Sequence, residues 1–304
     1  MEQSQYKTIA VVAIAVILVA ALAWVFVVDS EDEWELQASS DAAMMAALGS
    51  AMDDEEHIVV TLWIPHWAFA EYDNLVFLED PENIYGDAEE IQTIANDGWK
   101  KDNPDAYDIA ANFNWTAEEI GEVMDLQNEH GEAEGAQKWI DANNATVDAW
   151  INGTSGTGTI EVGLVDWACA QASTNVMKLV LEEAGFNVEV TTSDAGPMYA
   201  DLADDGGLDV TFTAWMPLTH ESYWDSEGDD LEVVGTSLEG AKTGLVVPQY
   251  TADELGLTTI ADLKDNGEHF DWKITGIDAG AGIMSATEDA LEEYLISQDA
   301  DEGY

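Results

Sequence analysis

Positive charge is nearly missing from this sequence of 304 residues. There is no arginine and there are eight lysines, against 63 aspartate and glutamate residues, so the formal net charge is -55. Binding to nucleic acid needs clustered cations that neutralise phosphates, and it is therefore excluded. Because 47% of the residues are hydrophobic and 12 are tryptophan, we expect a folded core and not a disordered chain. A solvated acidic surface is typical of proteins that work in concentrated salt, which screens self-repulsion, and it predicts a halophilic source.

The side chains of common catalytic and metal sites are also scarce. Cys169 is the single cysteine, so a disulfide framework and a thiolate zinc site are excluded. We expect it in an alanine-rich loop, with no basic neighbour to lower its pKa. The five histidines show no metal-ligand spacing, and no Ser-His-Asp or Cys-His arrangement is recognisable. We therefore expect no enzyme, no cofactor and no metal site.

A long uncharged run occurs at the start of the chain. Residues 8–28 carry no charge and are long enough to cross a bilayer as a helix. Lys7 precedes this run and the acidic segment 29–35 follows it, which predicts an amino terminus inside the cell and a soluble domain outside. We predict that residues 1–30 are one transmembrane anchor or a signal segment. Retention as an anchor is favoured, because the apolar run continues past the candidate cleavage site Ala21-Leu22-Ala23.

After residue 30, short apolar β runs alternate with helical segments, which predicts an α/β fold with parallel sheets flanked by helices. The turns Trp63-Ile64-Pro65 and Trp215-Met216-Pro217 resemble each other, as expected for two lobes built on one plan. Segment 80–150 is expected to be mostly helical, with a capping box formed by Thr116 and Glu119. The other expected elements are strands at 58–62, 160–166, 186–190 and 210–214, and helices at 173–184, ended by Gly185, and around 285–294.

Three of the strand-like runs end at a tryptophan: Trp63, Trp167 and Trp215. Open α/β sheets bind ligands beyond the carboxyl ends of their strands, so we expect these indoles to line one crevice. Electron-rich rings in a crevice bind quaternary ammonium groups. The alternative is that each tryptophan packs in a core, as large half-buried side chains do.

A glycine-rich loop at 276–284 leads into a helix and is expected to expose backbone N–H groups at the positive end of the helix dipole. Such a loop can hold a small anion without arginine. Its alternative role is a tight turn that needs glycine for positive φ. His220, which follows Trp215 by five residues, is a candidate donor to the same anion, or else a satisfied surface or helix-start histidine. An aromatic cage and an anion site together predict a zwitterionic ligand.

Several longer stretches carry a resemblance to a known family. They are 38–44, 63–67, 78–81, 165–167, 172–176, 195–199, 215–220, 244–250 and 276–284. From Trp34 onward, the sequence resembles the substrate-binding proteins of ABC importers for glycine betaine and related osmoprotectants.

The resemblance implies a two-lobed, periplasmic-binding-protein-like fold of type II, with a ligand cleft between the lobes. Lobe 1 is expected at 34–92 and 244–304, lobe 2 at 93–243, and the hinge crossings near residue 93 and between about 225 and 243. The resemblance also assigns roles to site residues. An aromatic prism around the trimethylammonium group is formed by Trp63, Trp167 and Trp215, and the carboxylate is held by the His220 side chain and the amides of Gly282 and Ile283.

The order of segments departs from that family. In relatives of this type, the 276–284 segment comes near the amino terminus and leads through its helix into the 38–44 segment. Here it lies at the end of the chain. We therefore predict a circular permutation, with its break between Tyr294 and Trp34.

These observations predict a receptor, anchored in the cell membrane with its soluble domain outside, that captures glycine betaine or a similar betaine and delivers it to an ABC permease. One alternative is a choline or carnitine receptor on the same scaffold, although choline has no carboxylate to occupy the anion site. The other is an acidic cell-surface structural protein, which would bind no small molecule.

Overall fold

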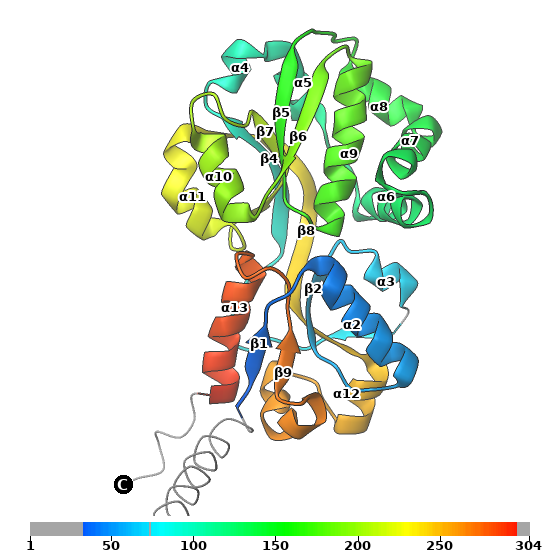
Figure 1. The fold of residues 1–304 in the computed structure, drawn as a ribbon, viewed down its shortest axis with the longest axis vertical. Coiled ribbons are helices and arrows are strands. Elements are labelled where there is room, and N and C mark those ends of the chain that lie inside the picture. The colour runs from blue at the N-terminus through cyan, green and yellow to red at the C-terminus, as the bar shows by residue number, and fades with distance from the viewer. Residues whose placement is uncertain (1–32, 73, 297–304) are drawn as a thin grey trace, which may run out of the picture.

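The computed structural model describes residues 33–72 and 74–296. The predicted membrane anchor or signal segment at 1–30 lies outside these residues. No helix within the two described ranges is long and apolar enough to span a bilayer. The described chain forms two lobes that follow one another along the longest axis (Figure 1). They are joined by strands β4 (Glu89–Asn96) and β8 (Leu231–Pro248).

Lobe 1, the lower lobe in Figure 1, is built from both ends of the described chain. Strand β1 pairs in parallel with β9, which brings the first and last described strands side by side. The predicted permutation requires such proximity, and it stays a prediction. The elements of lobe 1 are β1 (Glu35–Gln37), α2 (Asp41–Asp54), β2 (Val60–Ile64), α3 (Ala68–Glu71), β3 (Leu75–Phe77), α12 (Gln249–Leu255), η2 (Ile260–Phe270), β9 (Lys273–Thr275), α13 (Gly282–Ala290) and η3 (Leu291–Ile296).

Lobe 2, the upper lobe, contains the central part of the chain. The predicted capping box is confirmed: Thr116 Oγ1 accepts from the Glu119 N–H, and the Glu119 carboxylate accepts from the Thr116 N–H. The predicted stop at Gly185 is also confirmed, with φ of 104°. The elements of lobe 2 are α4 (Trp99–Asp102), α5 (Pro104–Asn112), α6 (Ala117–His130), α7 (Glu132–Ala142), α8 (Asn144–Ile151), β5 (Thr159–Leu164), α9 (Ala168–Glu183), β6 (Asn187–Thr192), α10 (Ala195–Ala203), β7 (Val210–Met216), α11 (Glu221–Glu227) and η1 (Gly228–Asp230).

The strands form one continuous path through both lobes, in the order β1-β9-β2-β8-β4-β7-β5-β6, with β3 also paired to β8. Strand β5 is parallel to β6 and β7, as predicted. The prediction of parallel sheets is wrong for the connecting strands, because β8 is antiparallel to β2, β3 and β4. The cause is the path of the chain, which enters lobe 2 through β4 and returns through β8 in the opposite direction. The prediction that 80–150 is mostly helical is confirmed by helices α4 to α8, and the strand β4 within this segment was not predicted.

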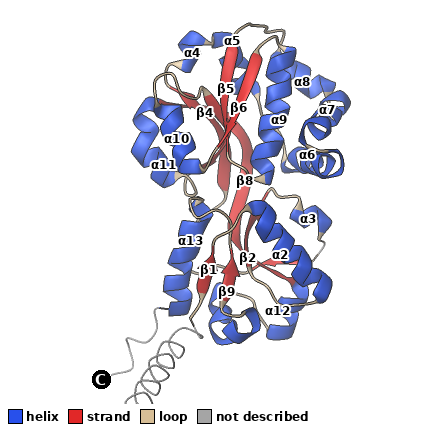
Figure 2. Ribbon diagram, viewed as in Figure 1, coloured by secondary structure: helices blue, strands red, loops and turns tan. Residues whose placement is uncertain are grey.

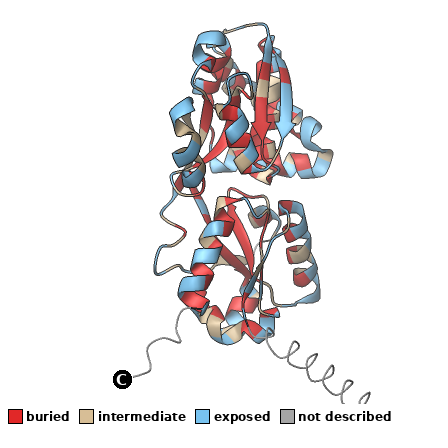
Figure 3. Cartoon of the chain, turned by 60° about the vertical axis from the view of Figure 1, so that its left-hand side comes forward, coloured by how far each residue is buried: buried red, intermediate tan, exposed pale blue. Residues whose placement is uncertain are grey.

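Helices flank the strands in both lobes (Figure 2), and the buried residues concentrate on the strands and on the helix sides that face them (Figure 3). Burial continues to the last residues of two strands, from Val60 to Trp63 in β2 and from Val210 to Trp215 in β7. Their tryptophans therefore lie where each lobe faces the other. The turns that follow also match, because the Ile64–Pro65 and Met216–Pro217 peptide bonds are both cis.

Candidate functional site

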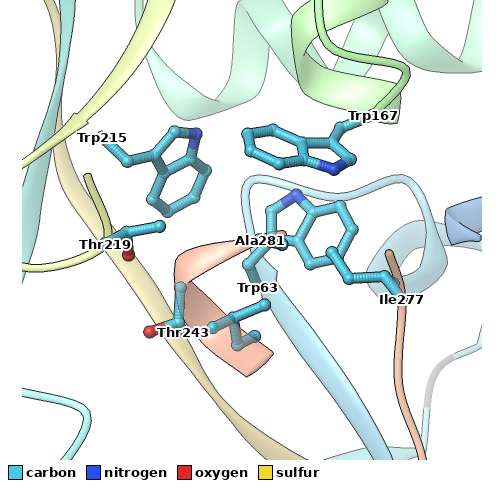
Figure 4. A pocket seen from close by; sticks show the side chains of 8 residues that line it. Trp63, Trp167, Trp215, Thr219, Thr243, Ile277 and Ala281 are labelled. Carbon is cyan, nitrogen blue, oxygen red and sulfur yellow. The ribbon is translucent and has the colours of Figure 1, made fainter. Parts of the chain in front are cut away.

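The three predicted tryptophans surround one cavity between the lobes (Figure 4). Trp63 lies in β2 of lobe 1, while Trp167 precedes α9 and Trp215 lies in β7, both in lobe 2. The space around the three rings, part of which is open to solvent, amounts to about 260 Å³. Its other lining residues are Thr219, Thr243, Ile277, Ala281 and Ile283.

All three indoles are withdrawn from solvent, with exposed fractions of 4%, 4% and 2% for Trp63, Trp167 and Trp215. They come from separate segments and converge on the same space (Figure 4). The simple alternative of isolated core tryptophans does not account for a shared cavity. In such a desolvated place, a cation over a ring face is attracted more strongly than at an exposed site.

His220 is fully buried directly before α11, so the surface alternative is wrong and the helix-start position is correct. Its Nδ1 accepts from the Trp215 N–H at 3.1 Å and lies 2.9 Å from the Tyr199 hydroxyl. Nδ1 is therefore the unprotonated nitrogen, and Nε2 carries the proton. Burial lowers the pKa of His220 to about 3, so the ring is neutral. His220 is not among the cavity-lining residues, but its ring lies beside that of Trp167, with centroids 5.6 Å apart. Its buried Nε2 has no hydrogen-bond partner among the described residues.

Helix α13 begins at Gly282, and the next residue, Ile283, lines the cavity. The N–H groups of a first helical turn have no partner within the helix. The loop does turn, with the Ala281 N–H bonded to the carbonyl of Asp278, but none of its glycines has positive φ, so the expected need for glycine at positive φ is wrong. Gly282 is required instead by close approach: a Cβ there would lie 1.8 Å from the backbone oxygen of Thr219 in lobe 2. The absence of a side chain lets the two lobes meet at this point.

Sequence reasoning missed a buried carboxylate that holds the loop before His220. Glu89 Oε1, in β4, accepts from the N–H groups of Leu218 and Thr219 at 2.9 and 2.8 Å. Its Oε2 accepts from the Thr219 hydroxyl at 2.5 Å. Glu89 stands beside other acidic residues in the sequence, so nothing local indicates that it is buried. Only its hydrogen-bond donors distinguish it from the exposed acidic residues. These bonds fix the position of Thr219 in the cavity wall.

The start of α9 was also misplaced, because the helix begins at Ala168 and not at Ser173. Its cap comes from another segment: the Ala168 N–H donates to Asp41 Oδ2 at 2.9 Å. Cys169 therefore lies in this helix and not in a loop. It is fully buried, and burial raises the pKa of its thiol to about 12.

Comparison with known proteins agrees with this architecture. The family model described as "Substrate binding domain of ABC-type glycine betaine transport system" matches residues 28–142 and 158–302. The glycine betaine/carnitine transport binding protein GbuC of Listeria monocytogenes is 41% identical over 237 residues, which cover 77% of each chain.

Two shorter similarities concern parts of the chain. An uncharacterized protein, ORF1, of Chromohalobacter salexigens is 34% identical over 136 residues, 44% of this chain and 84% of that protein. The glycine betaine/proline betaine-binding periplasmic protein of Escherichia coli is 31% identical over 137 residues, 41% of this chain and 40% of that protein. With most of its length matched by the family model, the chain belongs to the substrate-binding domains of ABC-type glycine betaine transport systems, which are receptors and not enzymes.

Proposed function

We propose that the protein captures glycine betaine, or a similar betaine, outside the cell and delivers it to an ABC permease. The observation that carries this proposal is the convergence of the buried rings of Trp63, Trp167 and Trp215 on one cavity. A trimethylammonium group among three indoles would gain roughly 0.5 to 2 kcal/mol from each ring. Because the rings are buried, this attraction is not lost through salt screening.

The carboxylate of the ligand is assigned to three donors. The first is the Nε2–H of His220, which is buried and has no partner within the part of the chain that the structure describes. The other two are the N–H groups of Gly282 and Ile283, in the first turn of α13. Buried donors are normally satisfied, and a ligand carboxylate supplies the missing acceptor. A neutral imidazole and two amides can serve this purpose in a protein without arginine.

Binding is proposed to close the two lobes, as in type II periplasmic binding proteins, with hinges in β4 and β8. The proposed ligand contacts span both lobes, so the ligand favours the closed arrangement. Residues 1–30 are proposed to anchor the domain to the cell membrane on its outer side. The expected lobe boundaries, 34–92 with 244–304 and 93–243, belong to the same proposal.

Titration calorimetry in molar KCl with glycine betaine, choline and carnitine tests this function. We expect glycine betaine to bind at one site per chain, and choline to bind more weakly because it has no carboxylate. Glycine is the matched control, since it lacks the three methyl groups and should not bind. Preference for choline or carnitine would support the alternative receptor. Absence of binding by all three ligands would contradict the proposal and favour a structural role.

A further inference from the structure

One cage tryptophan is tethered to the opposite lobe through its ring nitrogen. Trp167 Nε1, in lobe 2, donates to Asp278 Oδ2, in the loop between β9 and α13 of lobe 1, at 2.9 Å. In contrast, the Nε1 of Trp215 is buried with no hydrogen-bond partner in residues 33–72 and 74–296. Trp167 and Trp215 therefore present rings to the same cavity, but only the first has its ring orientation fixed by a charged acceptor from across the cleft.

A second contact from lobe 1 holds the backbone beside Trp167. Asp41 Oδ2, at the start of α2, accepts from the N–H of Ala168, and Asp41 Oδ1 lies 3.1 Å from His66 Nε2. The ring of His66 meets that of Trp63 edge to face, with centroids 4.8 Å apart. Two carboxylates of lobe 1 thus hold Trp167: Asp278 accepts from its indole N–H, and Asp41 accepts from the N–H of the next residue, Ala168. Asp41 is also linked through His66 to Trp63, the cage residue of lobe 1.

The loop that carries Asp278 is itself held by lobe 2. The hydroxyl of Tyr223, in α11, donates to the carbonyl of Gly280, and the Ala281 N–H closes a turn onto the carbonyl of Asp278. Asp278 is half-buried, and its buried Oδ1 accepts no hydrogen bond from any described residue. The Trp167 to Asp278 bond spans the lobes, so lobe separation would break it. Without that bond, the indole would be free to leave its cage orientation.

We infer that Asp278 is a positioning residue for ligand capture: it acts through the indole N–H of Trp167 and fixes this ring against the quaternary ammonium group as the lobes close. The cage is then complete only in the closed protein. Asp278 does not line the cavity and makes no contact with the ligand in this scheme. The inference rests on the proposed function.

A double-mutant cycle on the full chain tests this role, with glycine betaine affinity measured by calorimetry in molar KCl. Asp278→Ala should weaken binding about tenfold or more, the loss of a hydrogen bond to a charged group. Asp278→Asn keeps an acceptor oxygen and should restore affinity to within about threefold of the wild type. In a Trp167→Phe background, which has a ring face but no N–H, Asp278→Ala should change affinity by less than about twofold.

Trp215→Phe is the matched control background. The indole N–H of Trp215 has no partner in the described part of the chain, so Asp278→Ala should keep its full effect there. An equal loss from Asp278→Ala in the Trp167→Phe background and in the wild type would overturn the inference, as would failure of Asp278→Asn to restore binding. If the wild type binds no betaine, the proposed function fails. If it binds and Asp278→Ala binds equally well, only the positioning role fails.

Discussion

Replacement of Gly282 by alanine tests whether capture depends on the close meeting of the lobes. The added Cβ would lie 1.8 Å from the oxygen, 2.6 Å from the carbonyl carbon and 3.0 Å from the Cα of Thr219. Non-bonded carbon and oxygen atoms repel strongly below about 3 Å, so the lobes must separate by roughly 1 Å or more at this point. Overpacking of this kind costs about 1 to 3 kcal/mol. Because this cost falls on the closed state, it weakens betaine binding roughly 5- to 150-fold.

The measurement is calorimetric titration of Gly282→Ala with glycine betaine, beside thermal unfolding without ligand. Alanine is a better helix former than glycine, so we expect no loss of stability in α13 itself. Gly280→Ala is the matched control from the same loop, because the added Cβ would lie 3.7 Å from the Tyr223 hydroxyl, an ordinary van der Waals contact. Wild-type affinity in Gly282→Ala would refute the reasoning, since capture would then not require this contact.

Four further predictions concern the cage, the carboxylate, pH and salt. Alanine at any one of Trp63, Trp167 or Trp215 should weaken betaine binding at least about tenfold, and phenylalanine less, since a ring face remains; calorimetry on the six variants decides, and retained affinity in two alanine variants would defeat the cage. His220→Ala should cost betaine about 1 to 3 kcal/mol and choline almost nothing, whereas equal losses for both ligands would make the histidine structural. Burial lowers the pKa of His220 to about 3, so as the pH falls the histidine is protonated in the unfolded chain before it is protonated in the folded protein. The free energy of unfolding, measured with urea, should therefore be unaffected by this group above about pH 6.5 and should decrease as the pH falls toward 3. Betaine affinity should change little between about 1 and 3 M salt, while circular dichroism should show unfolding in dilute buffer, where the charge of -55 is unscreened; a stable fold there would argue against the halophilic origin.

The parts of the fold that were predicted from sequence depend on local patterns. The capping box of Thr116 and Glu119 was recognised because its partners are three residues apart. Trp63, Trp167 and Trp215 were expected to line one crevice because each ends a short apolar run, and they do line one cavity, whereas their role as a cage stays a prediction. Strand β4 was missed because Glu89 and Glu90 make its start look like surface, although partners far along the chain bury Glu89. Positions that depend on such distant partners have no local signature.

The same limit explains the first residues of α9. No local side chain caps this helix, and its acceptor, Asp41, lies 127 residues earlier. The interlobe bond of Asp278 to Trp167 joins residues 111 apart and was also not anticipated. Helix periodicity and strand alternation identify the walls of the cavity, whereas the contacts that hold those walls together are a property of the folded chain.

Strand β8 runs through both lobes, and this has a consequence for how binding could be sensed. Its residues 231–241 pair with β4, its residues 242–246 pair with β2, and Thr243, which lies opposite Trp63 in that ladder, is part of the cavity wall. In the proposed closure, with hinges in β4 and β8, the ligand would thus rest beside the hinge. A rotation that moves atoms only slightly at Thr243 would displace the outer ends of the lobes much farther, because they lie far from the hinge. A permease that touches those distant ends could therefore distinguish a loaded receptor from an empty one without contacting the bound molecule.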